Sequence, residues 1–257
     1  MTTLYAPAPA PMTPTPALAR LAWIELRKAV DTRAGRWLLV IIGLVAAATA
    51  VLTAVTKPAG NHNLPHVLGN TSQLVAILLP VLGILLVTSE WSQHTALTTF
   101  TLVPRRSRII AAKAAAGAVL AAAAAVVCIA VSLAVLAVAD HGQSGLWQDG
   151  GRAFGYAFVF QVLNVLLGVG FGVLCRSTPA AVVAYFVIPT AWSILTGTVS
   201  AMAATGRWLD PSTAWNHLAG GTVTATTWAQ VATTAAAWIA LPAVVGGWHV
   251  LHRPVNA

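Results

Sequence analysis

Few side chains in this sequence could do chemistry, and most of them stand outside its apolar runs. The candidates for metal or nucleophile chemistry are seven histidines and two cysteines: His62, His66, His94, His141, His217, His249, His252, Cys128 and Cys175. His62 and His66 are four residues apart, which suits a metal ion, but no acidic residue lies near them. Both cysteines lie in or at the end of apolar runs, as small packing residues do. The sequence therefore predicts no metal site and no catalytic residue.

Two further absences narrow the class of protein. No GxxxxGK[ST] phosphate loop occurs, so we expect no ATP hydrolysis by this chain alone. The apolar runs contain no Asp, Glu, Lys or Arg in their interiors, whereas ion-coupled transporters need ionisable groups at membrane depth. An intramembrane enzyme would have to use only Ser, Thr and Asn, with Asn164 as the buried amide to watch. We expect the chain not to be an enzyme.

One of the two main groups of charged residues lies in a polar stretch, residues 88–113, which reads TSEWSQHTALTTFTLVPRRSRIIAAK. Pro104 stands beside a basic cluster made of Arg105, Arg106 and Arg108. Guanidinium groups can pair with carboxylates of a partner protein, or they can anchor the loop to lipid headgroups. Both interpretations remain open at this point.

A second charged segment, residues 18–36, predicts an amphipathic helix lying in a membrane interface. Arg20, Arg27 and Asp31 share one helical face, and apolar residues share the other. Glu25 falls on the apolar side and breaks this pattern. It can form a surface pair with Lys28, three residues on, or contact a partner protein.

The surrounding composition predicts a polytopic, all-α membrane protein. Only 8% of the 257 residues are charged and 58% are hydrophobic, whereas soluble domains carry roughly 25% charged residues. A net charge of +8 would suggest nucleic acid in a soluble protein, but here we expect a lipid bilayer and no nucleic acid. We predict six spans at about 37–56, 72–89, 114–139, 153–175, 179–201 and 228–248, which together form one transmembrane domain, residues 37–248.

The remaining segments complete the expected topology. Residues 1–17 form a disordered Pro/Ala-rich tail, residues 57–71 a loop, and residues 249–257 a terminal tail. Eleven of the fourteen Lys and Arg residues fall on the side of the two termini and of the polar stretch. The positive-inside rule therefore places both termini and residues 90–113 in the cytoplasm.

Helix-breaking and small residues suggest where the spans pack or bend. Prolines in membrane helices are either simply tolerated or act as hinges, and small residues let helices approach closely. The candidates are Pro80, Pro189, Pro242, Gly168, Gly170 and Gly172. The expected external loop, residues 202–227, carries Trp208 and Trp215, which predict either an aromatic belt or short helices that re-enter the outer leaflet.

Together these features resemble an ABC-2 type permease, the membrane subunit of a bacterial ATP-binding-cassette exporter. The resemblance covers the chain after about residue 17. Its most specific part is the order Glu90-Trp91, Thr95, Leu102-Val103-Pro104-Arg105-Arg106 and Lys113. This is similar to the family's acidic-aromatic pair, Gly-Thr, Pro-x-x-Arg and Lys, although His94 stands where the family often has Gly.

The resemblance implies that the polar stretch forms a coupling helix docking on a separate ATPase, which holds the ATP and Mg²⁺. Glu90, Trp91, Thr95, Pro104, Arg105, Arg106 and Arg108 would make that contact. It also implies a second permease copy or a homologue, a bacterial cell-membrane location, and a hydrophobic or amphiphilic substrate such as a drug, antibiotic or lipid. The alternative is a membrane scaffold or sensor that recruits a cytoplasmic partner without transport.

Overall fold

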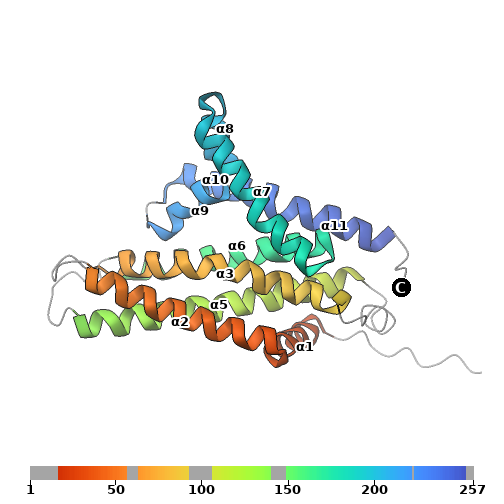
Figure 1. Ribbon diagram of the computed structural model, residues 1–257, viewed down its shortest axis with the longest axis horizontal. Coiled ribbons are helices and arrows are strands. Elements are labelled where there is room, and N and C mark those ends of the chain that lie inside the picture. The colour runs from red at the N-terminus through yellow and green to blue at the C-terminus, as the bar shows by residue number, and fades with distance from the viewer. Residues whose placement is uncertain (1–16, 57–62, 93–105, 140–148, 222, 253–257) are drawn as a thin grey trace, which may run out of the picture.

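The computed structural model describes residues 17–56, 63–92, 106–139, 149–221 and 223–252, and every regular element in these ranges is helical. Six of the helical segments are long and apolar enough to cross a membrane, which confirms the predicted number of spans. The first of them has 24 residues and is therefore about 36 Å long. The described part of the chain is thus an all-α, multi-pass membrane protein (Figure 1).

The helices follow one another with short connections. A short helix, α1 (Leu18–Asp31), precedes the spans α2 (Arg33–Thr56), α3 (Leu64–Ser92), α5 (Arg106–Ala139), α6 (Gly150–Cys175) and α7 (Thr178–Thr198). The last span consists of α10 (Ala225–Ala235), a π-helical turn (Ala236–Ala240) and α11 (Leu241–His252). Between α7 and α10 lie a 3₁₀ turn (Ser200–Met202), α8 (Ala203–Leu209) and α9 (Pro211–Ala219).

Several predicted segment boundaries are wrong. Residues 33–36 belong to α2, residues 225–227 to α10 and residues 249–252 to α11. Residues 64–71, predicted as loop, form the first two turns of α3. Pro65 stands in the first turn, where its missing N–H is not needed, and the Asn63 side chain accepts a hydrogen bond from the His66 backbone at 2.9 Å. Residues 106–113, also predicted as polar loop, belong to α5. The charged residues of that segment therefore lie on a helix and not between helices.

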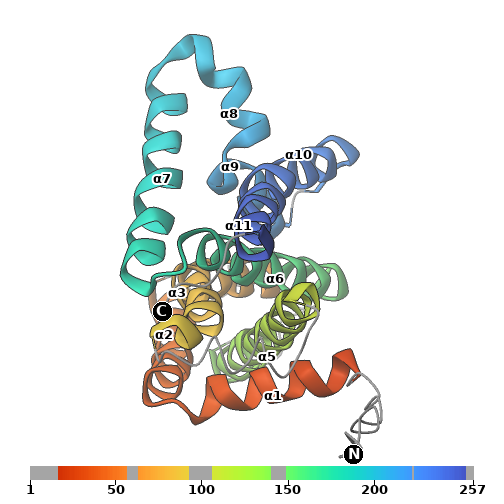
Figure 2. The same ribbon diagram turned by 90° about the vertical axis from the view of Figure 1, so that its right-hand side faces the viewer.

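Four spans, α2, α3, α5 and α6, form the main bundle, and α1 crosses it at one end (Figures 1 and 2). The closest approach joins α3 to α6. A Cβ atom added to Gly83 would lie 2.3 Å from the Val165 carbonyl oxygen. At Gly168 the same atom would meet the Pro80 carbonyl oxygen. The backbones of these two helices are thus in contact, and only glycine fits at both positions.

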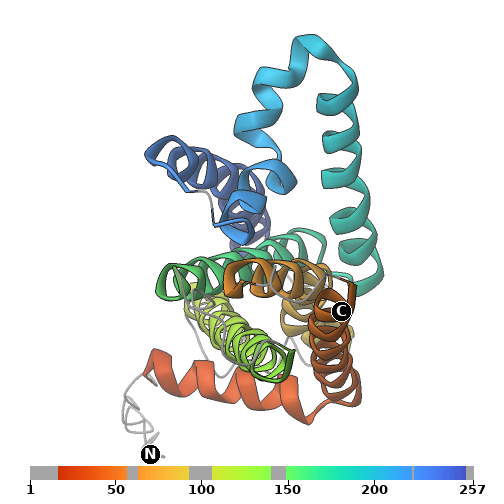
Figure 3. The same ribbon diagram turned by 90° about the vertical axis from the view of Figure 1, so that its left-hand side faces the viewer.

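The span α7 rises away from this bundle, and α8 and α9 return toward it (Figures 2 and 3). Asp210 fixes the return, because its buried carboxylate caps α9 through the Ser212 N–H at 2.9 Å and accepts from the Ser193 hydroxyl of α7 at 2.7 Å. Trp215 of α9 is 2% exposed and packs against α6. The segment predicted as an external loop thus contains two short helices, and both their re-entry into a leaflet and the aromatic belt stay predictions. Trp208 of α8 is 41% exposed.

The three intramembrane prolines have different surroundings. Pro80 lies inside α3 at the crossing with α6, and Pro189 lies inside α7. Pro242 comes two residues after the π-helical turn. Since proline lacks an N–H and clashes with the carbonyl four residues earlier, a local π turn is one way in which a membrane helix accommodates it. Their action as hinges stays a prediction.

Candidate functional site

The predicted coupling stretch connects the end of α3 to the start of α5. Glu90 and Trp91 belong to the last turn of α3, and Arg106 is the first residue of α5. Arg108 follows on α5 and is half-buried. Thr95, Pro104 and Arg105 lie outside the described residues. The two helix ends that flank this stretch lie beside α1 (Figure 2).

A buried ion pair fastens α1 to these helix ends. Glu25 of α1 is 6% exposed and Lys113 of α5 is 2% exposed. The Lys113 Nζ donates to the Glu25 Oε2, a hydrogen bond in which both partners are charged. The same Nζ donates to the Leu86 backbone carbonyl of α3 at 3.0 Å. One ammonium group therefore binds α1, α3 and α5 together.

The second carboxylate oxygen of Glu25 is also used. It accepts from the Lys28 Nζ at 2.8 Å, so the predicted Glu25–Lys28 pair is present. The prediction of a surface pair is wrong for Glu25, however, because its side chain is only 7% exposed while that of Lys28 is 46% exposed. We call Glu25, Lys28 and Lys113 the clamp.

The electrostatics of the clamp explain why its parts require one another. Removing an ionised carboxylate or ammonium group from water is costly unless an opposite charge and further hydrogen bonds compensate it. Glu25 accepts two hydrogen bonds from cations, and Lys113 donates one to a carboxylate and one to a backbone carbonyl. Losing Glu25 or Lys113 would therefore remove the opposite charge that the other contacts inside the bundle.

Sequence reasoning names Lys113 only as part of the family motif and does not predict its burial or its pairing with Glu25. The structure places it in the second turn of α5 and buries it. Glu25 lies on an apolar helical face and Lys113 lies at the start of an apolar run. A charge in either position needs a partner of opposite charge, and this was the signal in the sequence that could have indicated the pair. Their separation of 88 residues hides the pairing from any local pattern.

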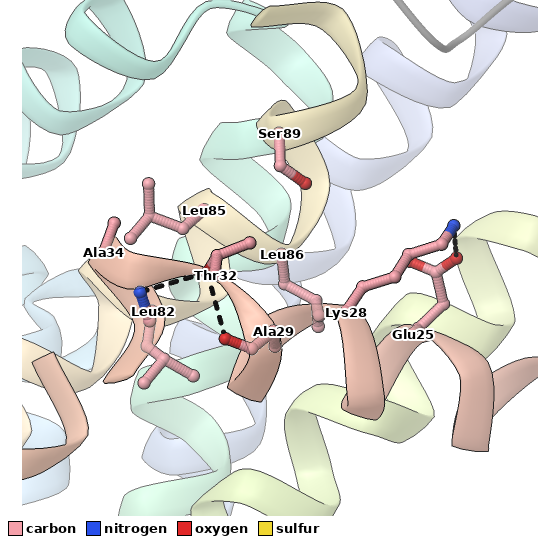
Figure 4. A pocket seen from close by; sticks show the side chains of 10 residues that line it. Glu25, Lys28, Ala29, Thr32, Ala34, Leu82, Leu85, Leu86 and Ser89 are labelled. Atoms are coloured by element: carbon pink, nitrogen blue, oxygen red, sulfur yellow. Dashed lines mark hydrogen bonds and ion pairs between the residues drawn. The ribbon is translucent and has the colours of Figure 1, made fainter. Parts of the chain in front are cut away.

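A cavity of about 170 Å³ adjoins the clamp, between α1, the start of α2 and the end of α3 (Figure 4). Its lining includes Glu25, Lys28, Thr32, Leu86 and Ser89. The Thr32 side chain shapes the corner between α1 and α2, since its hydroxyl donates to the Ala29 carbonyl and accepts from the Gly35 N–H, both at 3.1 Å. The cavity thus has a fixed wall on one side and the charged clamp on the other.

The other predicted residues of α1 stay outside this site. Arg20 is exposed. Arg27 and Asp31 form an ion pair at 3.6 Å, and both side chains are at least 70% exposed. A pair of this kind contributes about 1 kcal/mol or less. These residues therefore line the outer surface of α1 and do not join it to the bundle.

The predicted glycines serve helix packing. Gly168 and Gly172 of α6 face α3, where added Cβ atoms would meet Pro80 and Val87. Gly170 faces the π-helical turn, and its added Cβ would lie 3.2 Å from the Ile239 carbonyl oxygen. The fourth span therefore packs on two sides through alternate glycines.

Within the described residues no group of three or more His, Cys, Asp or Glu side chains is arranged to hold a metal ion. No protein-family model and no curated protein sequence matches the chain. The geometry of the clamp and the arrangement of the spans are thus the basis on which a function can be proposed.

Proposed function

We propose that this chain is the permease subunit of an ATP-binding-cassette exporter. The observation that carries the proposal is the clamp, which holds α1, α3 and α5 together at the two helix ends joined by residues 93–105. A segment attached to two such helix ends can pass a displacement into the bundle. The ABC-2 family, which the sequence resembles, uses its first cytoplasmic loop in this way.

The charges at this end of the molecule support a docking role. Arg105, Arg106 and Arg108 flank the start of α5, and guanidinium groups form strong pairs with carboxylates. We propose that they contact an acidic surface of a separate ATPase, together with Glu90, Trp91, Thr95 and Pro104. ATP and Mg²⁺ would bind only to that partner, because the chain has no phosphate loop.

The proposed orientation follows from charge. The α1 helix and the end of α11 lie at one end of the bundle (Figure 1), which is also the end of the clamp. Most Lys and Arg residues of the sequence belong to this end, so we place it in the cytoplasm of a bacterial cell and α1 in the membrane interface.

The proposal includes a second permease copy or a homologue. Among the six candidate spans, α7 is the least buried, with Val183, Val187, Ile188 and Ile194 all exposed. Such a face needs lipid or another apolar helix against it. A translocation pathway between two copies would be lined by apolar and small residues, which suits a hydrophobic or amphiphilic substrate.

Co-expression with a phosphate-loop ATPase chosen from the neighbouring genes tests the proposal. Wild type, Glu90→Ala and Arg105→Ala/Arg106→Ala are compared by copurification in lipid, with Arg207→Ala as the matched control because Arg207 is exposed on α8. We expect wild type and the Arg207 variant to bring the ATPase down and the other two to lose it. Equal binding by all four would make the arginines topology anchors. If no form binds, the permease assignment fails and the non-transporting scaffold gains support.

A further inference from the structure

The outer side of α1 and the first turn of α2 carry three positive charges that no described carboxylate neutralises. Arg20, Arg33 and Arg36 are exposed, and none of them forms an ion pair within the described residues. Their neighbour Arg27, by contrast, is paired with Asp31 at 3.6 Å. Three guanidinium groups at one end of the molecule are therefore available to anions from the surroundings.

The chain has few carboxylates to offer these arginines. It contains six acidic residues against fourteen Lys and Arg. Four of the six are engaged elsewhere: Glu25 in the clamp, Asp31 and Asp149 in ion pairs, and Asp210 at the start of α9. The adjoining residues 1–17 contain no Asp or Glu. This balance favours anions that are supplied from outside the chain.

An exposed tryptophan stands beside the arginines on each of the two helices. Trp23 is 65% exposed and follows Arg20 by three residues on α1. Trp37 is 69% exposed and follows Arg33 by four residues on α2. Side chains three or four residues apart are neighbours on a helix surface, and indole rings favour the headgroup depth of a bilayer. Both helices thus place a guanidinium group next to an interfacial aromatic ring.

Further apolar side chains are exposed on α1. Ile24 is 43% and Val30 is 40% exposed, and α1 runs across the end of the bundle (Figure 2). A helix with basic and apolar exposed side chains lies in the membrane interface, with the apolar ones at the edge of the hydrocarbon and the basic ones among the headgroups. An acidic protein surface would match the arginines but not these apolar side chains, whereas a layer of anionic lipid matches both.

The opposite side of α1 carries the clamp. Glu25 is 6% exposed and binds Lys113, whereas the side chain of Arg27, two residues further on, is 77% exposed. One helix therefore faces the surroundings on one side and holds α3 and α5 on the other. Any ligand that binds the outer side of α1 only in its clamped position stabilises that position by mass action.

We infer that the outer side of α1 and the first turn of α2 bind anionic phospholipids, whose phosphate groups pair with Arg20, Arg33 and Arg36. The indole rings of Trp23 and Trp37 lie among the headgroups. The bound lipid holds α1 against the bundle and thereby stabilises the clamp. This inference rests on the proposed interfacial position of α1 and needs no ATPase.

Fluorescence quenching tests the lipid preference on the purified full-length chain in nanodiscs, without an ATPase. The discs contain phosphatidylcholine with an increasing fraction of acyl-brominated phosphatidylglycerol or, in parallel, of acyl-brominated phosphatidylcholine. The contribution of Trp23 is the difference between wild type and Trp23→Phe. We expect phosphatidylglycerol to be favoured about fivefold beside Trp23, the effect of one basic side chain at an anionic surface. In 1 M salt, where the Debye length is about 3 Å, the preference should fall below about twofold.

Matched variants show whether charge causes the preference. Arg20→Gln/Arg33→Gln/Arg36→Gln should abolish it, and the same three positions changed to Lys should retain it within about twofold. The contribution of Trp228, which is 42% exposed on α10, is the control and should show no preference, because α10 carries no charged residue. Equal quenching of Trp23 by the two brominated lipids in wild type would overturn the inference whether or not a variant folds. A preference that persists in the Gln variant would overturn it as well.

Hydrogen exchange of the α1 amides tests the link to the clamp. In wild type we expect these amides to exchange about fivefold more slowly in discs with phosphatidylglycerol than in discs of phosphatidylcholine alone, since bound lipid opposes the opening of α1. The Gln variant should exchange at the same rate in both kinds of disc. Equal exchange of wild type in both would overturn the proposal that lipid holds α1 in place.

The outcome separates the lipid surface from the proposed transport function. A preference for phosphatidylglycerol in a chain that copurifies with no ATPase would support the lipid surface and count against the permease. Copurification of an ATPase with a chain that shows no lipid preference would support the permease and overturn the lipid surface.

Discussion

Replacing Glu25 by Gln tests the clamp most sharply, because it removes one charge and keeps the shape of the side chain. The variant takes the Glu25 carboxylate away from Lys113, which is 2% exposed, and keeps the hydrogen bond to the Leu86 carbonyl at 3.0 Å. Breaking a buried ion pair in this way typically costs about 3–5 kcal/mol. We expect the lower end, about 3 kcal/mol, since the Leu86 hydrogen bond remains and the new amide can accept one from Lys113.

Hydrogen exchange of the α1 amides measures this cost, because it reports the free energy of local opening. A loss of about 3 kcal/mol corresponds to roughly 150-fold faster exchange. Arg27→Ala is the matched control on the same helix, since it removes an ion pair whose side chains are at least 70% exposed, and should change exchange by about fivefold or less.

The double variant Glu25→Gln/Lys113→Met completes the experiment. It removes both buried charges, and replacing a buried ion pair by neutral groups of similar size is often close to neutral. Exchange in α1 should therefore return to within about tenfold of wild type. The account of the clamp is refuted if Glu25→Gln accelerates exchange no more than Arg27→Ala does.

Three further perturbations follow from the packing. Gly168→Ala should lower the thermal unfolding midpoint in detergent, because the added Cβ would overlap the Pro80 carbonyl. Gly155→Ala is the control and should leave the midpoint unchanged, because nothing lies within 4 Å of its added Cβ. Equal midpoints for the two variants would contradict the α3–α6 contact. Asp210→Ala should cost about 2 kcal/mol through loss of the α9 cap and should speed exchange in α8 and α9, while the exposed Asp149→Ala should not; unchanged exchange in α9 would contradict the capping role. Arg108→Ala should leave the unfolding midpoint within a few degrees of wild type and weaken ATPase binding, and a large loss of stability with unchanged binding would assign it to packing instead.

The number and nature of the spans could be predicted because they depend on local properties. A run of about 20 apolar residues is visible in any window of the sequence, and all six such runs are helical in the structure. Their ends were less predictable. The sequence predicts that Lys113 bounds a membrane segment, since an unpaired charge cannot enter hydrocarbon, but the distant Glu25 pairs with it inside the bundle.

The same limit applied to the aromatic residues and to the prolines. Tryptophan is typical of membrane interfaces, but Trp215 is buried because α9 packs against α6. Pro65 looks like a helix breaker, but in the first turn of α3 it does no damage. In each case the burial of the residue depends on a helix that is distant in the sequence. Local sequence patterns do not show which distant helix packs against a residue. Asn164, by contrast, was recognisable as a buried amide.

The most direct test of the permease assignment is ATP hydrolysis by the copurified complex in lipid, measured with wild type and with Arg105→Ala/Arg106→Ala. The account predicts that the wild-type chain changes the hydrolysis rate of the ATPase several-fold and that the loop variant, although folded to the same unfolding midpoint, leaves the rate of the free ATPase unchanged. Equal modulation by both forms would contradict a coupling role for the segment between α3 and α5.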